Sequence, residues 1–254
     1  MLIDVHSHLD FPDFEKDFDK VLERAKEAGV FAIISAGVNP ESNRKVLEIA
    51  GKYPIVKPAL GIYPSDALKM SDSEIENEIG FIRKSGPFAV SEVGLDGTYP
   101  EMEKQKLVFE KFIMLAKELD VPLIVHSRKA ESETVEMLAR LEAKKVVVHC
   151  FMGKLSIAKQ IEDNGWLFSV PCIIQTSSQF QELVKKVKST HLLTETDAPL
   201  LSAVKGKRNE PAFAADTIKK MAEIKGVAKE EMEKMVFMNY QRLFMGGPQK
   251  ALNL

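Results

Sequence analysis

Short apolar runs alternate with charged, helix-like stretches along the whole chain, and this alternation is the feature that most restricts its possible folds. The eight apolar runs lie at 2–6, 31–36, 55–60, 88–93, 122–126, 145–149, 166–170 and 191–196. Between them, apolar residues recur every three or four positions, as in DFDKVLERAKEAG at 17–29 and PEMEKQKLVFEKFIMLAKELD at 100–120. This spacing is typical of amphipathic helices. The sequence therefore predicts strands that alternate with helices throughout.

The predicted strands are almost continuously apolar, which indicates a parallel sheet covered by helices on both faces. Eight strand–helix units in 254 residues match the size of a (β/α)8 TIM barrel. We therefore predict an α/β protein with a TIM barrel fold, formed as a single domain over residues 1–254. A doubly wound parallel sheet is the structural alternative. The tail after Phe244, MGGPQKALNL, is expected to be loosely attached.

Charge and composition exclude several classes of protein. The formal net charge of -2 provides no general attraction to a polyanion, so a nucleic acid would have to be bound locally. No apolar run reaches the roughly 18 residues of a membrane span, and no basic region with a cleavage site begins the chain. Cys150 and Cys172 have no CxxC spacing, which fits small core residues in a reducing compartment. We expect a cytoplasmic protein.

Side chains that can bind metal lie at the C-terminal ends of five predicted strands. They are His6 and His8 at the first strand, Glu92 at the fourth, His126 at the fifth, His149 at the sixth and Asp197 at the eighth. Active sites of barrels form at the C-terminal ends of the strands, where residues distant in sequence converge. Residues i and i+2 of a strand share a face, so both histidines of HSH can point into the barrel mouth. His191 begins its strand instead, and we interpret it as structural.

Taken singly, each of these residues has an ordinary structural explanation. An HxH pair is common on surfaces, His126 or His149 could be a hydrogen-bonded core histidine, and Glu92 or Asp197 could cap a loop. A metal site explains better why four of the five histidines and two acids gather at one end of the barrel. Imidazole and carboxylate without thiolate favour Zn²⁺, Mn²⁺ or another divalent ion, with Mg²⁺ also a candidate. Six ligands divide well between two ions that share a carboxylate.

Seven motifs in order along the chain resemble those of the TatD family of metal-dependent hydrolases. They are DVHSHLD, SEVGLD, IVHSRKA, HCFMG, ETDAPLL, KRNEP and NYQRLF, and they extend from Asp4 to Phe244. The resemblance implies an amidohydrolase-like barrel and a divalent-metal hydrolase, with deoxyribonuclease activity in several members. It also implies a first ion on His6, His8 and Asp197, a second on His126 and His149, and Glu92 as the bridge between them.

Two stretches depart from the family pattern. Many members have His-Pro-His after the third strand, where this chain reads GIYPSDA, with Tyr63 and Ser65 in place of the histidines. The aromatic residue that usually follows GLD is also missing, since Gly97 follows Asp96. The substrate can therefore differ from that of better-known members.

These residues predict hydrolysis by a metal-activated water, with Asp197 and Glu92 as the catalytic residues. Two nearby divalent ions lower the pKa of a water that they share, and Asp197 is placed to accept its proton. Asp4 and Glu195 are candidates to orient ligand imidazoles, because a ligating histidine usually gives its other N–H to an acceptor.

Two arginines on loops after ligand-bearing strands are expected to bind substrate phosphate. Arg128 lies two residues beyond His126, and Arg208 lies in KGKRNEP with Lys205 and Lys207 beside it. Guanidinium groups match phosphate oxygens in pairs, although a solvated loop face would explain the same residues.

The leading hypothesis is therefore a phosphodiesterase that acts on DNA, single-stranded or at its ends, or on a small phosphodiester. Amide or carboxylic ester hydrolysis by the same metal site is the alternative, although a carbonyl substrate would gain little from the arginines. A partner-binding protein with a vestigial site is less consistent with a complete ligand set. No protein partner can be inferred from the sequence.

Overall fold

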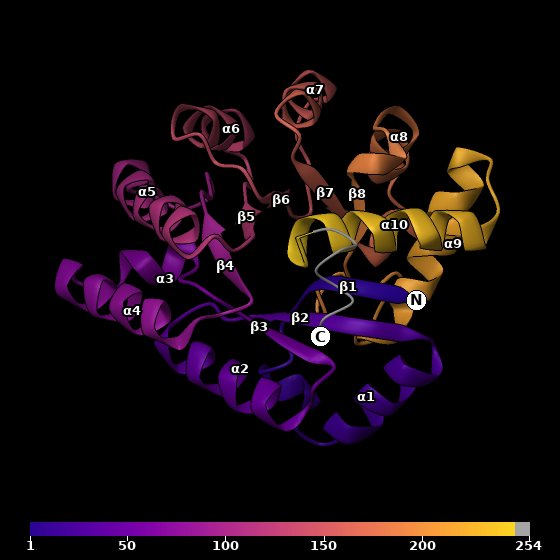
Figure 1. Ribbon diagram of the computed structural model, residues 1–254, viewed down its shortest axis with the longest axis horizontal. Coiled ribbons are helices and arrows are strands. Elements are labelled where there is room, and N and C mark those ends of the chain that lie inside the picture. The colour runs from indigo at the N-terminus through magenta and orange to yellow at the C-terminus, as the bar shows by residue number, and fades with distance from the viewer. Residues whose placement is uncertain (247–254) are drawn as a thin grey trace.

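A ring of parallel strands forms the centre of the protein (Figure 1). The structure, a computed structural model, describes residues 1–246. Its eight strands follow one another in chain order within one sheet, and all neighbouring pairs are parallel. They are β1 (Leu2–Ser7), β2 (Val30–Ala36), β3 (Val56–Leu60), β4 (Ala89–Gly94), β5 (Leu123–His126), β6 (Val146–Val148), β7 (Leu167–Val170) and β8 (Leu192–Thr194). A doubly wound sheet reverses its strand order, so this alternative is excluded and the predicted TIM barrel is confirmed.

The barrel closes between β8 and β1 through contacts that lie beside the predicted ligands. The Asp197 amide donates a hydrogen bond to the His6 carbonyl oxygen at 2.9 Å. Deeper in the barrel, the Asp4 carboxylate accepts hydrogen bonds from the Thr196 amide at 2.9 Å and from its hydroxyl at 2.6 Å. Burial raises the pKa of Asp4 to about 8, although both bonds oppose the shift. This seam holds the segments of His6 and Asp197 side by side.

Helices cover the outside of the ring (Figure 1). They are α1 (Phe18–Glu27), α2 (Pro40–Lys52), α3 (Pro64–Leu68), α4 (Asp72–Ser85), α5 (Met102–Leu119), α6 (Glu131–Arg140), α7 (Leu155–Asp163), α8 (Ser178–Lys186), α9 (Ala214–Lys225) and α10 (Lys229–Phe244), with short 3-10 turns η1 (Pro12–Phe14), η2 (Cys172–Gln175), η3 (Ser189–His191) and η4 (Pro211–Phe213). Local signals start some of them, since Asn39 caps α2 and a Ser71–Glu74 capping box begins α4. The helices predicted at 17–29 and 100–120 are α1 and α5.

Helix α10 covers the N-terminal end of the barrel and lies nearer the barrel axis than α6, α7 and α8 (Figure 1). Its Phe237 packs edge-to-face on Phe31, near the start of β2, with ring centroids 5.4 Å apart. Tyr240 and Phe244 pack on Phe88, the residue before β4, at 6.5 and 5.7 Å. The C-terminal end, where the predicted ligands lie, is therefore the end that remains available for a site.

Other expectations concern the tail, the cysteines and membrane spans. Residues 247–254, most of the tail predicted to be loosely attached, lie outside the described residues. Cys172 is buried and Cys150 is partly buried, and both are free thiols. Within residues 1–246, none of the helices combines the length and the apolar character needed to cross a membrane.

Candidate metal centre

The C-terminal ends of the strands bring the six predicted ligands into one cluster. His6 belongs to β1 and His8 follows it, Glu92 lies in β4, His126 ends β5, His149 follows β6, and Asp197 lies in the loop after β8. Their ligand atoms form three groups in which all atoms lie within 4.8 Å of one another: His6, His8 and Glu92; His6, His149 and Asp197; and Glu92, His126 and His149. The predicted convergence is therefore present, while the role of each residue as a ligand stays a prediction.

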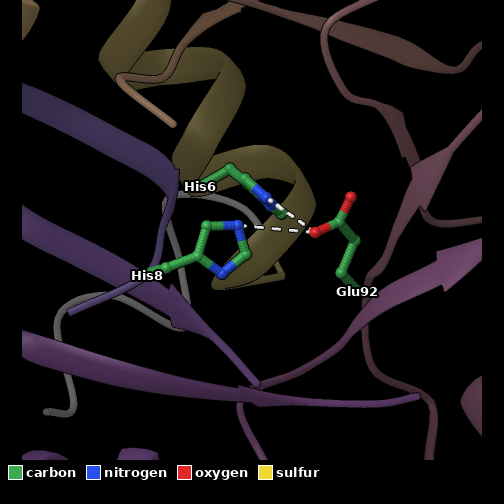
Figure 2. Close-up of side chains that lie close together, drawn as sticks. All are labelled: His6, His8 and Glu92. Carbon is green, nitrogen blue, oxygen red and sulfur yellow. Dashed lines mark ion pairs between the residues drawn. The ribbon is translucent and has the colours of Figure 1, made fainter. Parts of the chain in front are cut away.

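Glu92 lies between two pairs of histidines. Its Oε2 atom is 3.6 Å from His6 Nε2 and 3.4 Å from His8 Nε2 (Figure 2). Its Oε1 atom is 2.9 Å from His126 Nδ1 and 3.2 Å from His149 Nε2. One carboxylate with an oxygen toward each imidazole pair is the arrangement expected of a ligand shared by two ions.

Asp197 faces the first histidine pair. Its Oδ1 atom lies 3.5 Å from His6 Nε2 and 3.3 Å from His8 Nε2. The Asp197 backbone has a φ of 57°, in the left-handed region that costs most residues free energy but that aspartate tolerates comparatively well. Strained backbone of this kind is common at functional sites.

Each clustered imidazole has a neighbour for its second ring nitrogen. These contacts join His8 Nδ1 to Ala36 O at 3.0 Å, His126 Nε2 to Asp96 Oδ2 at 3.1 Å, His149 Nδ1 to Glu195 Oε2 at 3.3 Å and, more loosely, His6 Nδ1 to Ser91 Oγ at 3.5 Å. Such outer partners fix the tautomer and the ring orientation that a metal ligand requires.

The orienting acids differ in part from those expected. Glu195 contacts the imidazole of His149, in agreement with the sequence analysis. The expectation for Asp4 is wrong, because its carboxylate bonds to Thr196 and to the backbone N–H of His6 rather than to a ring nitrogen. Asp96 was missed as an orienting acid. The sequence did contain a signal for this role. Asp96 is an acidic residue just after β4, the strand that carries Glu92, at the end of the barrel where the predicted ligands lie.

Tyr63 occupies the position where many members have a histidine, and it contacts the same imidazole as Asp96. Its hydroxyl donates to Asp96 Oδ2 at 2.7 Å and lies 3.2 Å from His126 Nε2. Burial and the hydrogen bond to Asp96 raise the pKa of Tyr63, so the phenol keeps its proton. Tyr63, in place of the family's histidine, therefore provides a hydroxyl that donates a hydrogen bond to Asp96 next to His126.

Buried carboxylates give the cluster an anionic character. Glu92, Asp96, Glu195 and Asp197 are all buried, and their ion-pair partners among residues 1–246 are histidines. Burial opposes ionisation of Glu92, but hydrogen bonds from the surrounding histidines outweigh it and hold the pKa of Glu92 well below its usual value.

Two of the clustered histidines, His8 and His149, have raised pKa values instead. Burial disfavours the cationic form of His149, but Glu195 and Glu92 outweigh it and raise the pKa of His149 well above its usual value. For His8, the hydrogen bond to Asp197 and the charge of Glu92 overcome burial and raise its pKa to about 9. Positive charge is therefore strongly favoured within this cluster.

His6 provides the most direct evidence that a metal ion fits. Its Nε2 atom is buried and has no hydrogen-bond partner among residues 1–246, and such atoms are rare enough to require an explanation. Burial and the nearby charge of His149 lower the pKa of His6, which favours a neutral imidazole with a lone pair. A neutral imidazole beside two carboxylates suits a divalent ion.

The structure separates the two predicted arginines. Arg128 is exposed and lines a cavity of about 720 Å³ that also reaches Glu92 and Asp197. Arg208 instead forks onto Asp17, with nitrogen–oxygen distances of 2.7 and 2.9 Å, and does not line this cavity. A contact between Arg208 and substrate stays a prediction.

His191, which the sequence analysis interprets as structural, lies in η3, before β8, next to Glu162.

Comparisons with known proteins agree with this geometry. The family model described as TatD related DNase matches residues 3–245. The chain belongs to the TatD family. The resemblance found in its motifs is thereby confirmed, and so is the prediction of a hydrolytic enzyme.

Relatives of this TatD protein match over nearly their whole length. "Deoxyribonuclease TATDN3" from Homo sapiens is 35% identical over 96% of this chain and 94% of its own. The "Uncharacterized metal-dependent hydrolase YabD" from Bacillus subtilis is 32% identical, covering 96% and 99%. The crystal structure of the TatD homologue YJJV from Escherichia coli K12 has a TM-score of 0.89 at 32% identity and covers 97% and 98%. The barrel is therefore that of a TatD protein.

Proposed function

We propose that this TatD protein is a metal-dependent phosphodiesterase that cleaves DNA, single-stranded or at its ends. The observation that carries the proposal is Glu92, which places one carboxylate oxygen toward each of two histidine pairs beside a cavity that also holds Arg128. The human relative is named a deoxyribonuclease and the relative from Bacillus subtilis a metal-dependent hydrolase. The first name supports DNA as the substrate, and the second supports metal-dependent hydrolysis.

Two divalent ions would be held by the six clustered side chains. We assign the first to His6, His8 and Asp197 and the second to His126 and His149, with Glu92 shared. The charge of two divalent cations would balance the carboxylates of Glu92, Asp96, Glu195 and Asp197, which are all buried. When bound, such ions activate a water molecule and polarise a phosphoryl oxygen. The ligand types suit Zn²⁺, Mn²⁺ or Mg²⁺.

Asp197 is the group that moves the proton. Its carboxylate lines the cavity, where it can accept a proton from the attacking water as the new phosphorus–oxygen bond forms. It then returns this proton to the leaving oxygen as the old phosphorus–oxygen bond breaks. Glu195 and Asp96 hold the imidazoles of His149 and His126 in the required orientation.

Arg128 would contact the phosphate. Its exposed guanidinium forms no ion pair with a carboxylate among residues 1–246, so it can donate to phosphate oxygens without breaking an existing contact. Arg208 could bind phosphate only by breaking its hydrogen bonds to Asp17.

We also propose that the protein works in the cytoplasm as a single domain.

Hydrolysis of an amide or a carboxylic ester is the alternative, because the same histidines and carboxylates could act on a carbonyl group. It would leave Arg128 without a role. The test incubates protein loaded separately with Zn²⁺, Mn²⁺ and Mg²⁺ with end-labelled single-stranded and duplex DNA, using Asp197→Asn as the contamination control. We expect cleavage that the variant lacks. Turnover of an amide or carboxylic ester, with intact DNA under all three metals, would favour the alternative.

A further inference from the structure

The cavity beside the metal centre is larger than the centre itself requires. Its volume is about 720 Å³, within the range of about 300 to 1,000 Å³ that is typical of small-molecule sites. Part of the substrate other than the reacting phosphate can therefore be enclosed here.

The wall of this cavity has two chemically different halves. Polar and charged residues come from the segments after β3 and β5, including α3 and the start of α6, and include Tyr63, Ser65, Asp66, Arg128 and Glu131. Apolar residues come from the segments after β6, β7, β8, β1 and β2 and include Met152, Ile173, Leu200, Leu201, Phe11 and Val38. Because the strands follow one another in order around the ring (Figure 1), the two sets lie on opposite sides of the barrel mouth.

Part of the apolar half is exposed to water. Met152 is 45% exposed and Leu200 is 50% exposed, and the Phe11 ring stacks on the ring of His8 with centroids 4.8 Å apart. Apolar side chains that remain exposed together beside a functional site indicate a ligand that covers them. The stacking of Phe11 makes this surface continuous with the metal centre.

The polar half is suited to one phosphate rather than to a series of them. Arg128 is the one arginine or lysine among the described residues that line the cavity, and Asp66 and Glu131 lie on the same half. A groove that follows several nucleotides needs a row of cations along the backbone, whereas these carboxylates would repel a second phosphate. A single phosphodiester next to an apolar group matches this distribution.

We infer that the apolar half of the cavity, formed by Phe11, Met152, Leu200 and Leu201, is a subsite for the nucleobase of the single nucleotide that adjoins the reacting phosphodiester. The inference rests on the proposed nuclease function. These four side chains would favour a nucleotide that carries a base over an abasic one without selecting among bases, because every nucleobase has a flat apolar face that they can cover.

Binding of two small phosphates to the metal-loaded protein tests this subsite without any need for cleavage. Deoxyadenosine monophosphate and deoxyribose 5-phosphate share the sugar and phosphate but differ in the base, and calorimetry gives both dissociation constants. We expect the nucleotide to bind roughly 10-fold more tightly, as contact with one base face provides. Leu200→Gln should remove most of this difference. Leu107→Gln is the matched control, since Leu107 is 65% exposed on α5 and does not line the cavity.

The same proteins are then assayed for cleavage of single-stranded DNA that ends in a normal or an abasic residue. Preference for the normal end, lost in Leu200→Gln and kept in Leu107→Gln, would support the subsite. Equal binding of the two phosphates by the unmodified protein, or no binding of either, would overturn it whatever the cleavage result. If binding depends on the base but DNA is not cleaved, the subsite would be supported. Only the proposed nuclease function would then be contradicted.

Discussion

Asp96 and Tyr63 both contact the imidazole of His126, one of the predicted metal ligands. Asp96 Oδ2 lies 3.1 Å from His126 Nε2 and accepts a hydrogen bond from the Tyr63 hydroxyl at 2.7 Å. The carboxylate orients the ring directly, while the phenol mainly orients the carboxylate. Loss of the two groups should therefore have unequal effects.

We expect Asp96→Asn to weaken the metal site of His126 by roughly 10- to 100-fold, as loss of a ligand's outer partner usually does. Tyr63→Phe should weaken it less, because Asp96 still contacts the ring. Competition titrations of Zn²⁺ against a chromophoric chelator give both affinities. Equal losses, or a larger loss in Tyr63→Phe, would contradict this order. Glu136→Gln, on the exposed face of α6, is the control.

The two arginines predicted to bind phosphate should also differ. Arg128→Ala should lower kcat/KM for DNA by roughly 10-fold or more, because a charge-assisted hydrogen bond contributes about 1.5 to 3 kcal/mol. The loss should be smaller on a small aryl phosphodiester. An unchanged kcat/KM on both substrates would remove Arg128 from the site. Arg208→Ala is the comparison variant. It should lower kcat/KM less than Arg128→Ala does, because Arg208 is already paired with Asp17.

For single residues, sequence could predict which six side chains cluster but not the direction of loop side chains. The six clustered residues were found because strand ends in a barrel converge, whatever the details of the loops. Arg128 and Arg208 looked equivalent because both follow ligand-bearing strands. Their difference depends on Asp17, which lies 191 positions from Arg208 and meets it only in the folded chain.

Among the elements, α10 has the clearest structural task, since it covers the end of the barrel opposite the metal centre. Tyr240 is 1% exposed and packs on Phe88, next to β4. Burial of this aromatic ring joins the last helix to the strands that hold the site.

Tyr240→Ala should lower the free energy of unfolding by about 3 to 5 kcal/mol, as removal of a large buried aromatic ring does. Urea denaturation followed by circular dichroism measures the change. Met238→Ala on the same helix should alter stability by less than about 0.5 kcal/mol, because Met238 is 55% exposed. A similar effect of both changes would show that α10 contributes little through its buried face. At low temperature, kcat should be retained in both variants.

The regular elements were predictable from periodicity, whereas the short ones were not. All eight strands lie within two residues of the predicted runs at each end, because buried parallel strands are continuous apolar segments. The helix α3 (Pro64–Leu68) and the four 3-10 turns are too short to show a period. They form where loops pack on the barrel, which a local pattern does not record.

For the molecule as a whole, we expect folding and metal binding to be coupled. Folding buries Glu92, Asp96, Glu195 and Asp197 together, and bound cations would offset their mutual repulsion. Since the ligands are assembled only in the folded chain, metal binding adds to the free energy of unfolding.

Removal of metal by a chelator should therefore lower Tm. At free metal 100 times the dissociation constant, one site adds about 2.7 kcal/mol, and each kcal/mol shifts Tm by about 2 to 4 °C in a protein of this size. We expect a fall of about 5 to 10 °C per site in differential scanning fluorimetry. Asp197→Asn should show a smaller fall. An unchanged Tm after verified metal removal would contradict the coupling.

The binuclear centre is tested most directly by anomalous scattering from crystals of the metal-loaded protein, with data on both sides of the metal absorption edge. Two peaks are predicted, one next to His6, His8 and Asp197 and the other next to His126 and His149, with the Glu92 carboxylate between them. A single peak in fully loaded crystals, or peaks away from these side chains, would contradict the centre described here.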